Sequence, residues 1–109
     1  MNNQQAFNKM VQHLRAQNAT SKNNTGRCAY RGLFGRKCAV GALIPDEEYR
    51  TEFEDVIAST VVQNCPSLQG IDKGLLDSMQ NTHDNVSIRF WEDEFKEIAE
   101  EFDLYVPHQ

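Results

Sequence analysis

The sequence predicts an α+β fold that is mainly α, with about four helices around one core and a short β-hairpin near residues 27–41. Four stretches repeat apolar residues at helical spacing, which predicts the helices. One glycine-rich stretch separates two short runs, which predicts the hairpin. The 109 residues suffice for one core, so we expect a single compact domain over residues 1–109.

The helices are placed by the period of their apolar residues. Residues 4–17 carry an apolar stripe at positions i, i+3, i+4 and i+7, formed by Phe7, Met10, Val11 and Leu14. Thr51 and Glu54 have the spacing of a capping box, which predicts that a second helix starts there. The three later helices are predicted over residues 51–65, 72–83 and 88–102.

The hairpin prediction rests on the glycines of the segment 27–41. Residues 27–31 and 36–41 flank a four-residue connection with glycine at each end, Gly32-Leu33-Phe34-Gly35. An alternative interpretation makes Lys37–Ile44 a short buried helix. The period of so short an apolar run does not decide between the two structures.

Charge is divided along the chain. The first 45 residues contain seven basic residues and no acidic one, so they carry a charge of +7. The rest of the chain contains 16 acidic and four basic residues and carries -12, which gives the whole chain a net charge of -5. In one interpretation the two parts neutralise each other, within one chain or across a homodimer. In the other, one face binds a phosphate-bearing or oppositely charged partner.

The hairpin also supplies the candidate binding residues. Basic and aromatic side chains alternate there: Tyr30, Arg31, Phe34, Arg36 and Lys37. Guanidinium groups can meet phosphates while rings stack on bases, so this combination suits a macromolecular or nucleotide contact. The alternative is a structural hairpin whose arginines pair with acids of the later helices.

Metal and catalytic sites are not predicted. Cys28, Cys38, Cys65 and His83 could form a four-ligand set, but they lack the closely spaced pairs of zinc sites. Cys28 and Cys38 could instead face each other across the hairpin. We interpret His83 as a buried histidine that ends a helix and Asp84 as a local hydrogen-bonding stop. No nucleophile elbow or nucleotide fingerprint occurs, so we expect no enzyme and no cofactor.

Much of the chain carries a family resemblance. The matching residues are Cys28, Tyr30-Arg31-Gly32, the run Gly35-Arg36-Lys37-Cys38-Ala39-Val40-Gly41-Ala42-Leu43-Ile44-Pro45-Asp46, Tyr49, Gln80, His83-Asp84 and Trp91. This pattern resembles a group of short, mostly uncharacterised proteins of bacteria and their phages. The group has leucine where this chain has Met79. The resemblance implies a bacterial or phage origin.

These observations predict a small, non-catalytic binding protein that engages or inhibits a host macromolecule, encoded by a phage or mobile element. A host protein is the expected partner, and nucleic acid is another candidate. One alternative is a protein that binds a small ligand or a nucleotide with the glycine-rich basic hairpin. A second alternative is an acidic DNA mimic built on helix 88–102. No apolar run approaches membrane length and the first residues lack signal-peptide character, so we expect no membrane contact and a cytoplasmic location.

Overall fold

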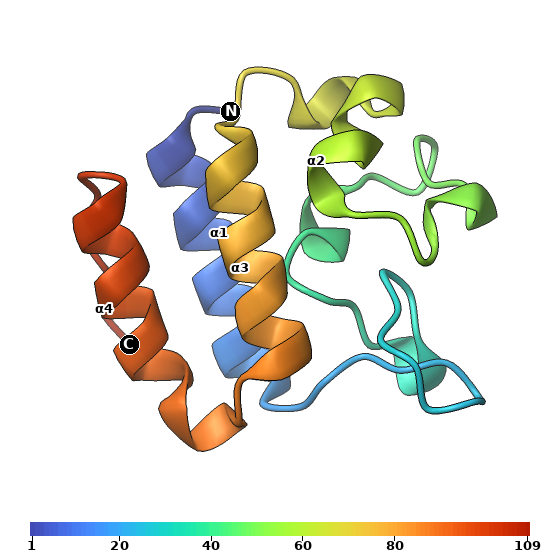
Figure 1. Cartoon of the computed structure of the whole chain (residues 1–109), viewed down its shortest axis with the longest axis horizontal. Helices are drawn as coiled ribbons and strands as arrows, with labels where there is room; N and C mark the ends of the chain where they lie inside the picture. The colour runs from blue at the N-terminus through green and yellow to red at the C-terminus, as the bar shows by residue number, and fades with distance from the viewer.

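Three long helices form one half of the molecule and irregular segments form the other (Figure 1). The computed structural model describes residues 1–109. Its long helices are α1 (Asn3–Gln17), α3 (Lys73–Asn85) and α4 (Trp91–Glu101). A fourth helix, α2, is short, and six 3-10 helices complete the secondary structure: η1 (Leu33–Gly35), η2 (Gly41–Leu43), η3 (Thr51–Phe53), α2 (Ala58–Val61), η4 (Val62–Asn64), η5 (Pro66–Leu68) and η6 (Ile88–Phe90).

Local caps explain where the long helices begin and end. Asn2 and Gln5 form a capping box at the start of α1, and Asn18 ends the helix in the left-handed conformation at φ 47°. Asp72 caps α3 by accepting a hydrogen bond from the Gly74 N–H. These two helices confirm the predictions for residues 4–17 and 72–83. The last helix is also confirmed, but α4 begins at Trp91 because η6 precedes it.

The predicted β-hairpin is wrong, and with it the α+β class. The structure contains no strand, although its mainly helical character is as predicted. Residues 27–41 form a loop that makes only two isolated antiparallel bridges, Lys22 with Cys28 and Arg31 with Lys37. The turn between the two runs is the 3-10 helix η1.

Side chains from elsewhere in the chain accept hydrogen bonds from the backbone N–H groups of this loop. The N–H groups of Tyr30 and Arg31 donate to the Glu54 carboxylate at 2.9 and 3.3 Å. The Lys37 N–H donates to the Gln17 side-chain oxygen at 2.9 Å. These side-chain contacts satisfy the backbone of the loop without a ladder of paired strands, and the two to the Glu54 carboxylate are of the stronger, charge-assisted kind.

The helix predicted over residues 51–65 is also wrong in its extent. Glu54 does not complete a capping box with Thr51, because its carboxylate accepts from the Tyr30 and Arg31 N–H groups and from the Tyr49 hydroxyl. Asp55 then adopts φ +67°, which ends any right-handed helical path. Only the four residues of α2 are α-helical in this region.

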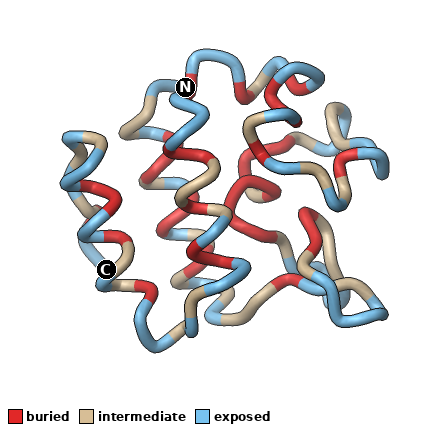
Figure 2. The backbone as a smooth tube through the Cα atoms, in the orientation of Figure 1, coloured by how far each residue is buried: buried red, intermediate tan, exposed pale blue.

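One hydrophobic core of 25 buried residues runs through both halves, from α4 across α1 and α3 to the irregular segments. Buried positions of α1 and α3 face the centre of the molecule, where the chain between them also turns inward (Figure 2). The run from Cys38 to Ile44 is almost wholly buried and packs on α1 through η2. The alternative prediction of a buried helix over residues 37–44 is therefore right about the burial of this run. It is wrong about the extent of the helix, because only Gly41–Leu43 is helical. No helix has the length and apolar character that a membrane span requires.

Arg15 joins α1 to α4 and to the C-terminal tail. Its guanidinium donates twice to the Glu92 carboxylate, at 2.7 and 2.8 Å, and once to the Pro107 carbonyl oxygen at 2.8 Å. The hydrogen bonds from Arg15, with the attraction of its charge, lower the pKa of Glu92 from its usual 4.5. The ionised form of this pair is therefore part of what holds α4 in place.

The Arg15–Glu92 pair predicts a loss of stability in acid. A carboxylate whose folded-state pKa is depressed contributes stability above its unfolded pKa, and this is lost as the pH falls through the folded value. We expect the Tm to decrease as the pH is lowered past 4.5. The variant Glu92→Gln should have a lower Tm at neutral pH, and its Tm should decrease less steeply in acid. Thermal melts of both proteins from neutral pH to acid measure this, and parallel curves would contradict it.

Candidate functional site

The most exposed aromatic side chain of the molecule lies at the turn in the middle of the loop 27–41. Phe34, in η1, is 87% exposed, and its neighbour Leu33 is 45% exposed. The Phe34 backbone adopts φ +64°, in the left-handed region that favours glycine. The Arg36 guanidinium carbon lies 5.4 Å from the centre of the Phe34 ring. We call residues Leu33–Lys37 the exposed tip.

The base of the exposed tip is fixed to α1. The Lys37 carbonyl oxygen accepts hydrogen bonds from His13 Nε2 at 2.9 Å and from the Gln17 side-chain amide at 2.8 Å. The Ser21 hydroxyl donates to the Arg36 carbonyl oxygen at 3.1 Å. Rigid support of this kind reduces the entropy that a contact surface loses on binding.

Two of the five candidate binding residues are engaged with other parts of the chain. Tyr30 is buried, and its hydroxyl donates to the Val56 carbonyl oxygen. The Arg31 guanidinium pairs with Asp46 at 2.8 Å and lies 4.4 Å from the centre of the Tyr49 ring. Both side chains hold the loop in place, whereas Phe34, Arg36 and Lys37 come together in the exposed tip.

The charge division is only partly neutralised within the chain. Three of the seven early basic residues form ion pairs with later acids: Arg15 with Glu92, Arg27 with Asp55 and Arg31 with Asp46. The other four form none: Lys9, Lys22, Arg36 and Lys37. On α4, Lys96 interrupts an outer face whose exposed acids are Asp93, Glu97, Glu100 and Glu101. Unpaired bases are thus left at the exposed tip.

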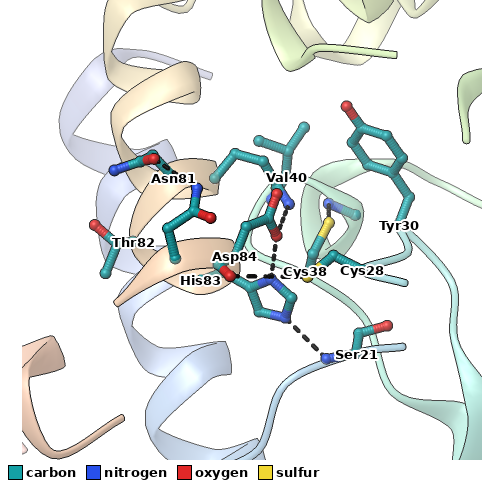
Figure 3. Close-up of polar contacts among 12 residues, drawn as sticks. Ser21, Cys28, Tyr30, Cys38, Val40, Asn81, Thr82, His83 and Asp84 are labelled. Atoms are coloured by element: carbon teal, nitrogen blue, oxygen red, sulfur yellow. Dashed lines mark hydrogen bonds and ion pairs between the residues drawn. The ribbon is translucent and has the colours of Figure 1, made fainter. Parts of the chain in front are cut away.

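Figure 3 shows a second polar cluster, around His83 at the C-terminal end of α3. His83 is fully buried, and its Nε2 accepts a hydrogen bond from the Ser21 N–H at 2.8 Å. A backbone N–H can only donate, so Nε2 carries no proton and Nδ1 does. Nδ1 therefore donates to Asp84 Oδ1, 2.6 Å away. His83 is the neutral Nδ1–H tautomer, and it ties the loop before the exposed tip to α3.

This arrangement does not fit catalysis by Cys28, His83 and Asp84. Their ligand atoms lie within 4.8 Å of one another. However, the His83 nitrogen that would serve as a base is already occupied by Ser21. Burial and the Asp84 charge raise the pKa of the Cys28 thiol, which disfavours the nucleophilic thiolate.

A metal does not fit these three residues either. A metal on His83 Nδ1 would displace its proton to Nε2, which would then face the Ser21 N–H donor. The four-ligand set considered from the sequence also has other partners. Cys38 Sγ accepts from the Gly41 N–H at 3.2 Å, and Cys65 Sγ donates to Glu48 at 3.0 Å. Burial, above all, raises the pKa of both thiols to about 12.

A cavity of about 360 Å³ opens beside this cluster, against the C-terminal half of α3. Its volume is at the lower end of the range of ligand pockets. Three segments distant in sequence line it: residues 28–30, 55–58 and 77–85. We call it the α3 cavity. The sequence showed one sign of it, because Asp77, Gln80, Asn81 and Asp84 share a helical face at i, i+3, i+4 and i+7.

Comparison of the chain with protein-family models, curated proteins and solved structures gives no match. Two features of the molecule suit the binding of a partner or ligand. One is the exposed tip, which is apolar, basic and rigidly supported. The other is the α3 cavity, which combines apolar residues with carboxylates and amides.

Proposed function

We propose that this chain is a non-catalytic binding protein that contacts a partner protein through the exposed tip. The observation that carries the proposal is Phe34, an 87% exposed aromatic residue in left-handed backbone with a guanidinium beside its ring. Binding hot spots in protein interfaces are aromatic or arginine side chains more often than most other types, and they fill desolvated pockets of the partner.

The conformation of Phe34 is unfavourable for folding alone. A non-glycine residue in the left-handed region costs about 1–2 kcal/mol, and glycine would make the same turn without that cost. The ring gains little from burial in this chain, since most of it faces solvent. A partner that covers the ring would supply the missing burial, and Leu33, the exposed neighbour of Phe34 in the chain, could add to it.

The charges around Phe34 indicate the chemistry of the partner. Lys22, Arg36 and Lys37 form no ion pair in the structure. We therefore expect an apolar recess bordered by carboxylates, which would take the ring and pair with the bases. The resemblance to proteins of bacteria and their phages supports a bacterial host protein as this partner.

Nucleic acid is the second candidate, because Phe34 could stack on a base while Arg36 meets a phosphate. Two observations make it the weaker one. The tip offers a single exposed ring, and Tyr30 and Arg31 are engaged inside the molecule. The net charge of -5 also repels a phosphate backbone.

A pull-down tests the proposed function. The tagged protein is compared in bacterial lysate with the double variant Phe34→Ala/Arg36→Ala, with and without nuclease, and captured proteins are identified by mass spectrometry. We expect one protein to be enriched, to survive nuclease and to be lost in the double variant. Loss of binding should be at least about tenfold, since hot-spot residues contribute ~2 kcal/mol or more.

The matched control is Tyr105→Ala, which removes another aromatic residue that is 64% exposed but lies far along the chain from the tip. It should capture the same protein as the unaltered chain. Capture that depends on intact nucleic acid would support the second candidate instead. Capture that is equal in the double variant and the control would overturn the proposal for the tip.

A further inference from the structure

The α3 cavity has one apolar side and one polar side. Val56, Ile57 and Ala58 supply apolar groups, and Ile57 is left 67% exposed at its edge. The polar groups come from α3, which supplies Asp77, Gln80, Asn81 and Asp84. A cavity with an apolar wall and a few convergent polar groups is the usual form of a small-ligand site.

Hydrogen bonding leaves part of each carboxylate free. Asp77 Oδ1 accepts from the Ser59 N–H at 3.0 Å, and Asp84 Oδ1 accepts from Gln80 at 2.9 Å and from His83 at 2.6 Å. Neither Oδ2 atom has a hydrogen-bond partner or an ion pair. Each carboxylate is thus held in position by one oxygen while the other remains available.

Acidic side chains place negative charge around the α3 cavity, since Asp55, Asp77 and Asp84 line it and no lysine or arginine does. The pKa of the Tyr30 hydroxyl is raised, first by burial and further by nearby negative charges that include Asp84 and Asp77. The pKa of the Cys28 thiol is raised by burial and by Asp84. Among the cavity's acids, only Asp55 has a cationic partner, the exposed Arg27 at 3.3 Å. A cationic ligand would therefore be favoured over an anionic one.

The distance between the Asp77 and Asp84 carboxylates restricts the kind of cationic ligand that could bind both. Asp77 and Asp84 are seven residues apart, so they lie on one side of α3 about 10 Å apart along the helix axis. A single ammonium cannot reach both. We propose that the α3 cavity binds a short alkyl diamine, with one ammonium at each carboxylate and the methylene chain against Val56 and Ile57. This site is separate from the exposed tip and does not depend on the proposed function.

Calorimetric titration with 1,4-diaminobutane at low salt tests this inference. We expect saturable binding that weakens as salt rises, and a matching increase in Tm, since a ligand that binds the folded state stabilises it. n-Butylamine, with one charge, and 1,4-butanediol, with none, should each bind at least about tenfold more weakly, because each lacks a charged hydrogen bond.

Two variants locate the site. Asp77→Asn removes one charge but keeps an oxygen for the Ser59 N–H, and Ile57→Ala removes exposed apolar surface, so both should remain folded. Each should weaken diamine binding, Asp77→Asn by about tenfold. The control Asp93→Asn changes an exposed carboxylate on α4 and should bind normally. Absence of binding, equal affinity for n-butylamine, or unchanged affinity in Asp77→Asn would each overturn the inference.

Discussion

Replacing Gly41 with alanine is expected to lower the free energy of unfolding by about 3 kcal/mol, at the upper end of the usual effect of overpacking. A Cβ at this position would overlap the Tyr30 carbonyl oxygen and lie 3.0 Å from its carbonyl carbon and 3.2 Å from Cys38 Sγ. The first two atoms belong to the backbone and cannot rotate away. Relief therefore requires the Tyr30 segment to move off the buried run.

Chemical denaturation of Gly41→Ala measures this effect, and for a chain of this size the Tm should fall by roughly 15 °C. Gly26→Ala is the matched control, because a Cβ there meets no atom within 4 Å and only the φ of +83° opposes it. The control should lose about 1 kcal/mol. A Gly41→Ala protein as stable as the unaltered one would mean that Tyr30 and Gly41 are not packed as described.

The second large effect is expected at His83. Replacing it with leucine keeps the apolar bulk but removes the acceptor of the Ser21 N–H and the donor to Asp84. Ser21 is fully buried, so its N–H would lose its partner without reaching water. We expect a loss of about 3 kcal/mol, the upper range for an unsatisfied buried group. Hydrogen exchange at the Ser21 amide should accelerate as well.

Nitrogen NMR of the unaltered protein checks which ring nitrogen of His83 carries the proton. The two ring nitrogens of His83 should show a protonated Nδ1 and an unprotonated Nε2, the tautomer that the Ser21 contact requires. His108→Leu is the control for stability, because His108 is exposed near the end of the chain. A proton on Nε2, or an unchanged stability in His83→Leu, would contradict the described cluster.

Local signals predicted the long helices because their causes are local. The stripe of Phe7, Met10, Val11 and Leu14 is buried on α1 as expected, and Asn2 caps the helix from the position directly before it. A capping side chain and a periodic apolar face act within a few residues, so the sequence shows both. The helix predicted from Thr51 to Cys65 was wrong because the contacts that decide this region are distant in sequence. Its Glu54 binds the backbone of Tyr30 and Arg31, more than 20 residues away.

The candidate site was predictable in part. Phe34, Arg36 and Lys37 were selected by residue type and lie together at the exposed tip. The engagement of Tyr30 and Arg31 with the rest of the chain could not be predicted from the sequence, because it depends on the distant residues Glu54, Asp46 and Tyr49. The sequence shows only the polar α3 face of the α3 cavity, because the cavity itself forms where three separate segments meet.

Photocrosslinking from the tip tests the central proposal most directly. The photoreactive residue p-benzoyl-phenylalanine replaces Phe34 in one protein and Tyr105 in another, and both are irradiated in bacterial cells. Both positions are exposed, so neither substitution should disturb the fold. The proposed function predicts a discrete protein adduct from position 34 that is absent from position 105. No adduct at position 34, or the same products from both positions, would contradict a binding role for the exposed tip.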